Sequence, residues 1–83
     1  MQERHWDKCL SLIKDEVNDQ QYKTWFKPIE LVEISSSTIS LRVPSKFFYE
    51  WLEEHYLELL DKSIKKVIGK NLKIEYVVSE LKV

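Results

Sequence analysis

The sequence predicts an α+β domain in which two helices precede a β-hairpin and a helix and a third strand follow it, in the order α-α-β-β-α-β. The first observation is length, because 83 residues are enough for one small domain with one thin core. The second is periodicity, because apolar residues recur every three or four positions in some segments and every second position in others. The third is the placement of the single glycine and the two prolines at the borders of these segments.

The first helix is predicted over residues 2–18, where apolar residues three or four positions apart share one face. These residues are Trp6, Cys9, Leu10, Ile13 and Val17. Asn18 or Asp19 is placed to cap a short second helix. That helix carries Tyr22, Trp25 and Phe26. Pro28 prevents it from continuing, because a proline biases the preceding residue away from helical backbone angles.

A β-hairpin is predicted after Pro28, because the period changes to two. Residues 29–34 alternate with both faces partly apolar, and residues 35–37 are a polar run of serines. Residues 39–43 alternate more clearly, which is typical of a half-buried return strand.

A long third helix is predicted from residue 46 to residue 66 or 68, with Ser45 as its cap and Gly69 as its stop. Residues 72–78 alternate again and are predicted as the third strand. We expect the helices to cover one face of the three-stranded sheet and to leave the other face partly exposed to solvent.

Composition argues against several classes of function. A net charge of −1 and a pI near 6.1 disfavour a domain whose main task is to bind nucleic acid. Two histidines and one cysteine cannot form a closed structural zinc site, and no glycine-rich stretch is present to hold a phosphate. We therefore expect no enzyme, no metal and no cofactor in this chain. No apolar run is long enough to span a membrane and no signal peptide is evident, so we expect a cytoplasmic protein without membrane contact.

The third helix carries an anomaly. On a helical wheel, Phe47 falls on the charged side, opposite the apolar stripe, and Trp51 lies beside it at i,i+4 spacing. An aromatic pair on a charged helix face is typical of a partner-binding patch. The alternative is that the helix bends in its first turn, or that the second helix covers both rings.

Trp6 is the opposite case, because periodicity places it in the buried stripe of the first helix. It also stands in the first turns, where a helix can extend past its sheet and present a large ring to a neighbour. The basic residues between Lys62 and Lys73 are interpreted as a solvated face. Any contact with nucleic acid should be weak and salt-sensitive, aided by base stacking on Phe47.

An ordered set of motifs resembles the N-terminal domain, domain I, of the bacterial replication initiators of the DnaA family. The motifs are W-x-x-C-L at 6–10, Y-x-x-W-F-x-P at 22–28 and V-P-S-K-F at 43–47, followed by Trp51. The similarity covers residues 3–79. It implies a KH-like fold and an interaction domain over residues 1–79, with 80–83 as the start of a linker or tail. The ATPase and the origin-binding module of such an initiator would lie outside this chain.

The resemblance also implies partners and roles for individual residues. It implies weak self-association through Trp6, recruitment of the replicative helicase DnaB, and docking of regulators of the DiaA, HobA and SirA kind. Phe47 matches an aromatic residue that contacts the helicase and, weakly, single-stranded DNA. Gln21 stands where the family has an acidic helicase contact, so the charge is lost here. Together with the helical wheel, the candidate helicase and regulator surface comprises Gln21, Trp25, Ser45, Lys46, Phe47 and Trp51.

A second function from a different class is a stand-alone, weak single-stranded nucleic-acid binder with a KH-like fold. The chain lacks the G-x-x-G clamp of KH domains, and its net negative charge is poorly suited to that task.

Overall fold

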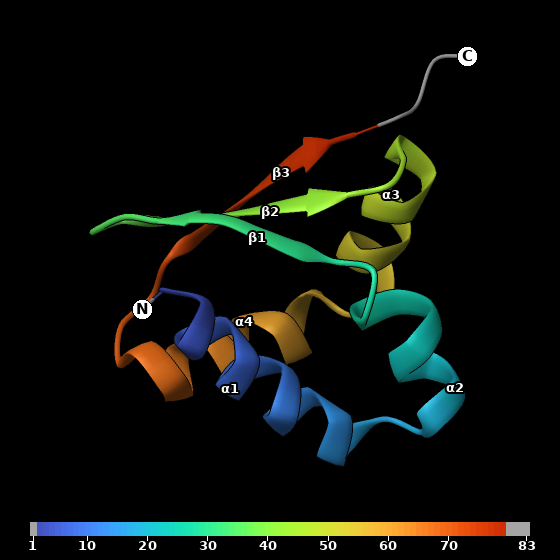
Figure 1. Cartoon of the computed structure of the whole chain (residues 1–83), viewed down its shortest axis with the longest axis horizontal. Helices are drawn as coiled ribbons and strands as arrows, with labels where there is room; N and C mark the ends of the chain where they lie inside the picture. The colour runs from blue at the N-terminus through green and yellow to red at the C-terminus, as the bar shows by residue number, and fades with distance from the viewer. Residues whose placement is uncertain (1, 80–83) are drawn as a thin grey trace.

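A three-stranded sheet with helices packed beneath it forms the architecture of the computed structural model, which describes residues 2–79, with side chains from Arg4 onward (Figure 1). The predicted linker or tail, residues 80–83, lies outside the described residues. The elements are α1 (Gln2–Glu16), α2 (Asp19–Gln21), the π-helix η1 (Tyr22–Phe26), β1 (Glu30–Ile34), β2 (Thr38–Val43), α3 (Lys46–His55), α4 (Leu57–Ile68) and β3 (Lys73–Val78). The predicted α+β class and the places of its three strands are confirmed.

The first two helices follow the predicted pattern. The apolar stripe of α1 enters the core through Trp6, Cys9 and Ile13, all of which are buried. Asn18 then caps α2 reciprocally: its side chain accepts from the Gln21 N–H at 2.7 Å, and its own N–H donates to the Gln21 side chain at 3.1 Å. The next turn widens into η1, which periodicity did not indicate, and it ends before Pro28 as expected.

The sheet has the order β1-β2-β3, which the sequence left open. β1 pairs antiparallel with β2, and β3 pairs parallel with β2. Ser35 closes the hairpin, since its hydroxyl oxygen accepts from the Thr38 N–H at 3.0 Å. The alternating residues Ile39, Leu41 and Val43 of β2 face the helices and are buried.

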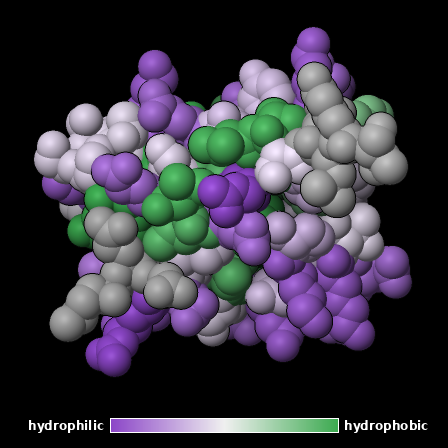
Figure 2. Space-filling view, turned by 45° about the horizontal axis from the view of Figure 1, so that its top comes forward, coloured by the Kyte–Doolittle hydropathy of each residue, from purple (hydrophilic) through white to green (hydrophobic). Residues whose placement is uncertain are grey.

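The other face of the sheet meets solvent. Arg42 of β2 lies there opposite Glu30 of β1, and their side chains form an exposed ion pair at 3.5 Å. Val32 and Val77 on the outer strands are each 41% exposed. Figure 2 looks obliquely onto this side and shows hydrophobic areas interrupted by hydrophilic residues. The expectation of a partly exposed sheet face is therefore confirmed.

The prediction of one long third helix is wrong, because the chain breaks at Tyr56 into α3 and α4. Tyr56 leaves helical geometry, with φ −126° and ψ 7°, although its N–H still donates to the Leu52 carbonyl at 2.8 Å. The break lets α3 pack against β2 and β3 while α4 turns to pack against α1. The Tyr56 ring meets Phe26 edge-on at 5.0 Å, which anchors the break to η1. Gly69 ends α4 as predicted, with φ 89° in the left-handed region.

The core lies between the sheet and the helices. Its buried apolar members are Trp6, Cys9, Ile13, Phe26, Ile29, Ile39, Leu41, Val43, Leu52, Leu60, Ile64 and Leu72. Cys9 is a buried thiol that lies 3.8 Å from the Ser63 carbonyl, and burial raises its pKa to about 11. The expectation that Cys9 packs as a small buried residue is confirmed. Among residues 2–79 there is no helix long and apolar enough to cross a membrane.

Candidate functional site

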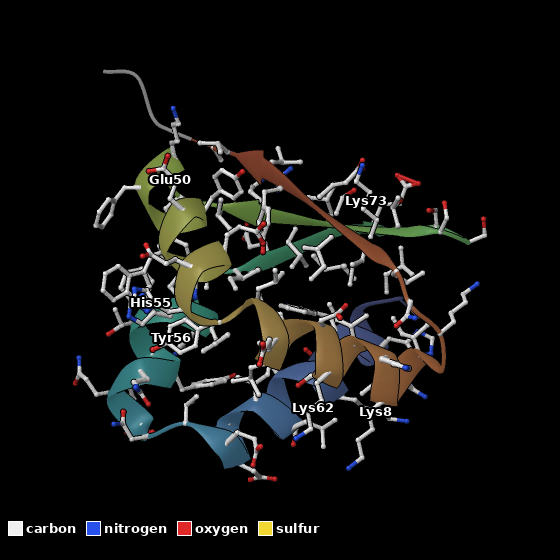
Figure 3. All side chains as sticks on the ribbon, turned by 180° about the vertical axis from the view of Figure 1, so that it is seen from behind. Lys8, Glu50, His55, Tyr56, Lys62 and Lys73 are labelled. Atoms are coloured by element: carbon white, nitrogen blue, oxygen red, sulfur yellow. The ribbon has the colours of Figure 1, made fainter. Side chains whose placement is uncertain are left out.

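Five rings from η1 and α3 gather on one side of the molecule, and we call them the aromatic surface: Trp25, Phe47, Phe48, Trp51 and His55. Figure 3 shows α3 from behind, with Glu50 near its upper end and His55 near its lower end, beside η1. Trp25 comes from η1 and the other four from α3. The surface therefore joins two helical segments that are separated in sequence by the whole hairpin.

Trp51 occupies the middle of the aromatic surface. Its ring stacks on Trp25, with centroids 5.1 Å apart and planes 12° apart, and it also contacts His55 at 4.1 Å. Phe48 tilts against Trp25 at 5.1 Å. The buried Nε1 of Trp51 makes no hydrogen bond with any described residue. A buried indole N–H usually finds a hydrogen-bond partner. The interactions shown for the Trp51 side chain are instead its ring contacts with Trp25, Phe47 and His55.

Phe47 projects from this packed group. Its side chain is 67% exposed, whereas no other large apolar residue among those with described side chains exceeds 41%. Its ring centroid lies 6.4 Å from that of Trp51. The prediction that Phe47 lies on the solvent side is confirmed. Trp51 instead agrees in part with the alternative, in which the second helix covers the ring. Trp25 of η1 stacks on one side of the Trp51 ring.

The start of α3 fixes where Phe47 points. Ser45 is the N-cap, and its side-chain oxygen accepts from the Phe48 N–H at 3.1 Å. The role of Ser45 as a helix cap is confirmed, and its hydroxyl is already occupied within the domain. Lys46 follows as an exposed cation next to Phe47. The cap thus places a positive charge and an exposed ring side by side.

Gln21 lies at the end of α2, immediately before η1, and is half-buried. Its amide oxygen is engaged by the Asn18 N–H in the capping box. The Gln21 side chain therefore serves a structural purpose, as part of the cap of α2. Its amide nitrogen still carries two hydrogen-bond donors.

Trp6 lies away from the aromatic surface, in the part of α1 that begins at the opposite end of the molecule from α3 (Figure 1). The ring is only 4% exposed, as periodicity indicated, and its Nε1 makes no hydrogen bond with any described residue. It lines a surface pocket of 280 Å³ together with Asp7, Glu30, Leu31 and Arg42. The structure thus separates Trp6 from the other candidate site residues.

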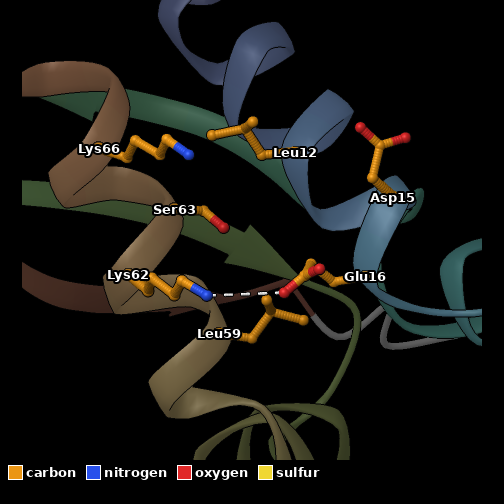
Figure 4. Close-up of a pocket in the computed structure, with 7 residues that line it drawn as sticks. All are labelled: Leu12, Asp15, Glu16, Leu59, Lys62, Ser63 and Lys66. Atoms are coloured by element: carbon orange, nitrogen blue, oxygen red, sulfur yellow. Dashed lines mark ion pairs between the residues drawn. The ribbon is translucent and has the colours of Figure 1, made fainter.

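A second pocket, of 230 Å³, lies between α1 and α4 (Figure 4). The Lys62 ammonium and the Glu16 carboxylate approach to 3.6 Å across it, and both side chains are largely exposed. Exposed pairs of this kind contribute little to stability. Within residues 2–79 no group of three or more His, Cys, Asp or Glu side chains is placed to hold a metal ion.

The sequence did not predict that Phe48 and His55 belong to the aromatic surface. Phe48 follows Phe47 in the motif, but its part in the surface depends on the contact with Trp25, which is distant in sequence. His55 stands four residues after Trp51, a spacing that brings helix side chains together, and this spacing was a usable signal.

The fold and the rings define a small α+β domain with an aromatic surface from which Phe47 projects into solvent. The family model described as "DnaA N-terminal domain" matches residues 3–66. The chain belongs to the DnaA N-terminal domain family, as its sequence motifs predicted.

Relatives support the same assignment. The chain is 56% identical over 71 residues to the chromosomal replication initiator protein DnaA of Flavobacterium psychrophilum, covering 86% of this chain and 15% of the relative. It is 45% identical to the DnaA of Bacteroides fragilis over 71 residues, with the same coverage of 86% and 15%. It is 42% identical over 74 residues to the DnaA of Chlorobaculum tepidum, covering 89% of this chain and 15% of the relative. The chain thus spans about 15% of the length of these relatives.

Proposed function

We propose that this domain is a protein-docking module of a replication initiator, and that the aromatic surface binds the N-terminal region of the replicative helicase DnaB. The observation that carries the proposal is Phe47, an aromatic side chain 67% exposed at the edge of a packed group of rings. Exposed aromatic rings are enriched at the centres of protein interfaces. Leaving such a ring in water is unfavourable for an isolated domain, and a partner that covers it removes this cost.

The packing behind Phe47 also supports the proposal. Trp25 contacts both Trp51 and Phe48, and the three rings form a support that requires little rearrangement before binding. An anchor on a pre-organised support loses less conformational entropy when it is buried. One exposed ring makes a small interface, so we expect weak affinity per domain, strengthened when several initiators act together.

The residues around Phe47 would contribute in different ways. Lys46 is exposed and can pair with an acidic residue of the partner or of a DiaA-, HobA- or SirA-type regulator. Ser45 would contribute indirectly, by holding the first turn of α3 in place, since its side chain already caps that helix. Gln21 carries no charge, so at this position it would contribute hydrogen bonds to the partner but no ion pair.

The variant Phe47→Ala tests helicase docking. We expect it to weaken binding of the purified N-terminal domain of DnaB by about tenfold or more, as measured by isothermal titration calorimetry. Leu57→Ala is the matched control, because Leu57 is also an exposed apolar residue, at 40%, but lies on α4. Equal binding by wild type and Phe47→Ala, or equal losses in both variants, would contradict the proposal.

We further propose that weak self-association uses the surface around Trp6. The ring itself is 4% exposed, so a second copy would meet mainly the rim of its pocket, where Arg42 is exposed. Trp6→Ala alone is a poor test, because removing a buried Trp costs about 3–5 kcal/mol of stability. We expect Arg42→Glu to reduce self-association in sedimentation velocity without unfolding the domain. Lys65→Glu, the same charge change on an exposed residue of α4, should leave it unchanged.

The second candidate function, weak binding of single-stranded DNA, is favoured by the neighbouring exposed side chains of Lys46 and Phe47. A base can stack on the ring while the ammonium meets a phosphate. We expect an oligothymidine to bind detectably at about 50 mM salt and to lose most of its affinity at about 150 mM. Micromolar binding at the higher salt, abolished by Phe47→Ala, would make this the main function.

A further inference from the structure

A groove of 410 Å³ lies between α3 and β3, on the other side of α3 from the aromatic surface. Its lining residues are Tyr49, Glu53, Ile74, Glu75, Tyr76 and Val78. Tyr49 and Glu53 each come two residues after a ring of the aromatic surface, which places them about 200° around the helix from Phe47 and Trp51. The groove therefore shares no lining residue with the aromatic surface.

The strand that forms one wall of the groove is an edge strand. β3 stands last in the order β1-β2-β3, so among residues 2–79 no strand pairs with its outer side. The N–H groups of Lys73 and Ser79 donate inward, to the carbonyls of Ser37 and Val43, both at 2.9 Å. Because strand residues alternate, the N–H groups between them, on Ile74, Tyr76 and Val78, point toward the free edge.

The side chains on the helix-facing side of β3 are incompletely covered. Ile74 and Tyr76 are half-buried, and Val78 is 40% exposed. The Tyr76 ring packs on Tyr49 of α3, with centroids 4.9 Å apart. An added strand would therefore find three backbone donors along its length and an apolar floor under every second side chain.

The charge of the groove is negative. Glu53 accepts a hydrogen bond from the Tyr76 hydroxyl at 3.0 Å, and burial together with this carboxylate raises the pKa of Tyr76, so the hydroxyl keeps its proton. Glu75 also lines the groove and adds a second, exposed carboxylate, from the strand position whose side chain points to the other face of the sheet. The cation on this strand, Lys73, lies toward the end of β3 away from α3 (Figure 3). No ion pair involving Glu53 or Glu75 occurs among the residues with described side chains.

We propose that this groove binds an extended basic peptide segment of a partner protein, which pairs with β3 as a fourth strand and places a Lys or Arg against Glu53. Addition of a strand to an exposed sheet edge is an established mode of peptide recognition, in which backbone hydrogen bonds give affinity and alternate side chains give specificity. A second copy of this chain fits less well. Its own Glu53 and Glu75 would bring like charges to the same seam.

The first test uses three synthetic peptides on the isotope-labelled chain, followed by NMR. A hexapeptide with Val, Lys and Val at every second position and Thr between them, called the Val–Lys peptide, should bind and shift the amide signals of Ile74, Tyr76 and Val78. Its helix-facing side then carries both the apolar side chains and the cation that meets Glu53. The same peptide with Glu in place of Lys should not bind. The Val–Lys peptide with every backbone nitrogen methylated should also fail, because methylation removes the backbone donors of both edges. Binding by the methylated peptide with unchanged affinity overturns the proposal, because it identifies non-specific charge attraction.

The second test uses a matched pair of variants. Glu53→Gln keeps the hydrogen bond to Tyr76 but removes the charge, and we expect it to weaken binding of the Val–Lys peptide by about fivefold. Glu54→Gln makes the same change on an exposed neighbour outside the groove and should have little effect. Equal losses in both variants, or peptide-induced shifts confined to Phe47 and Trp51, would refute the groove as the binding site.

Discussion

At the scale of single residues, two aromatic side chains one helical turn apart have different environments. Trp51 is stacked on Trp25, whereas Phe47 extends past η1 into solvent. The helical wheel predicted the side of α3 on which both lie, since this depends only on spacing along one helix. It could not predict which ring is covered, because Trp25 reaches Trp51 from a segment on the other side of the hairpin.

Phe47→Ala is expected to leave the fold almost unchanged, because the ring buries little area in the domain. The thermal unfolding midpoint, followed by circular dichroism, should fall by no more than about 4 °C, which corresponds to less than about 1 kcal/mol. Phe26→Ala is the contrasting control: Phe26 is fully buried, and its loss should cost about 3–5 kcal/mol. A large decrease for Phe47→Ala would show that its ring supports the core.

The burial of Cys9 makes the free energy of unfolding depend on pH in the alkaline range. Its pKa in the folded domain is raised from 9.0 to about 11 by burial, so the unfolded chain loses this proton first as the pH rises. The contribution of the protonated thiol to the free energy of unfolding is fully present below pH 9.0 and is lost as the pH rises toward 11. We expect urea unfolding to show a decrease of about 2 kcal/mol over this window. Tyr76, whose pKa is raised from 10.0, adds to the loss at the upper end of this window. Cys9→Ala should therefore reduce the decrease without abolishing it, whereas the same slope in both proteins would assign the decrease to other groups.

At the scale of elements, Ser45 has a capping role that can be separated from any partner contact. Ser45→Ala removes the acceptor of the Phe48 N–H and should cost about 1 kcal/mol, measured by urea unfolding. Ser45→Asp supplies another acceptor and should restore stability. If Ser45→Asp is as unstable as Ser45→Ala, the hydroxyl has a function other than capping.

Local signals explain which elements the sequence could predict. Asn18, Ser45 and Gly69 act within one turn of their own position, and their caps lie where local chemistry places them. The break at Tyr56 has no such signal, because no proline or glycine interrupts the segment and the apolar spacing continues through it. The break arises because α3 packs on the sheet while α4 packs on α1, and this depends on tertiary contacts. The same is true of the parallel pairing of β3.

At the scale of the whole molecule, α3 separates two surfaces of different chemistry. One side presents Phe47 beside a cation, and the other presents the acidic groove along β3. Trp6 defines a third region, at the far end of α1. A domain of 83 residues can therefore offer separate contact regions, and the surface variants at Phe47, Arg42 and Glu53 each change one region while leaving the others intact.

The parallel pairing of β2 with β3 has a consequence for the order in which the domain folds. Thr38 pairs with Lys73, and both α3 and α4 lie between them in the chain, whereas the β1–β2 hairpin closes over a few residues. Closing the longer loop costs more chain entropy, so we expect β3 to join after the rate-limiting step. In stopped-flow experiments Ile74→Ala should then accelerate unfolding and leave the refolding rate nearly unchanged, whereas Ile39→Ala should slow refolding.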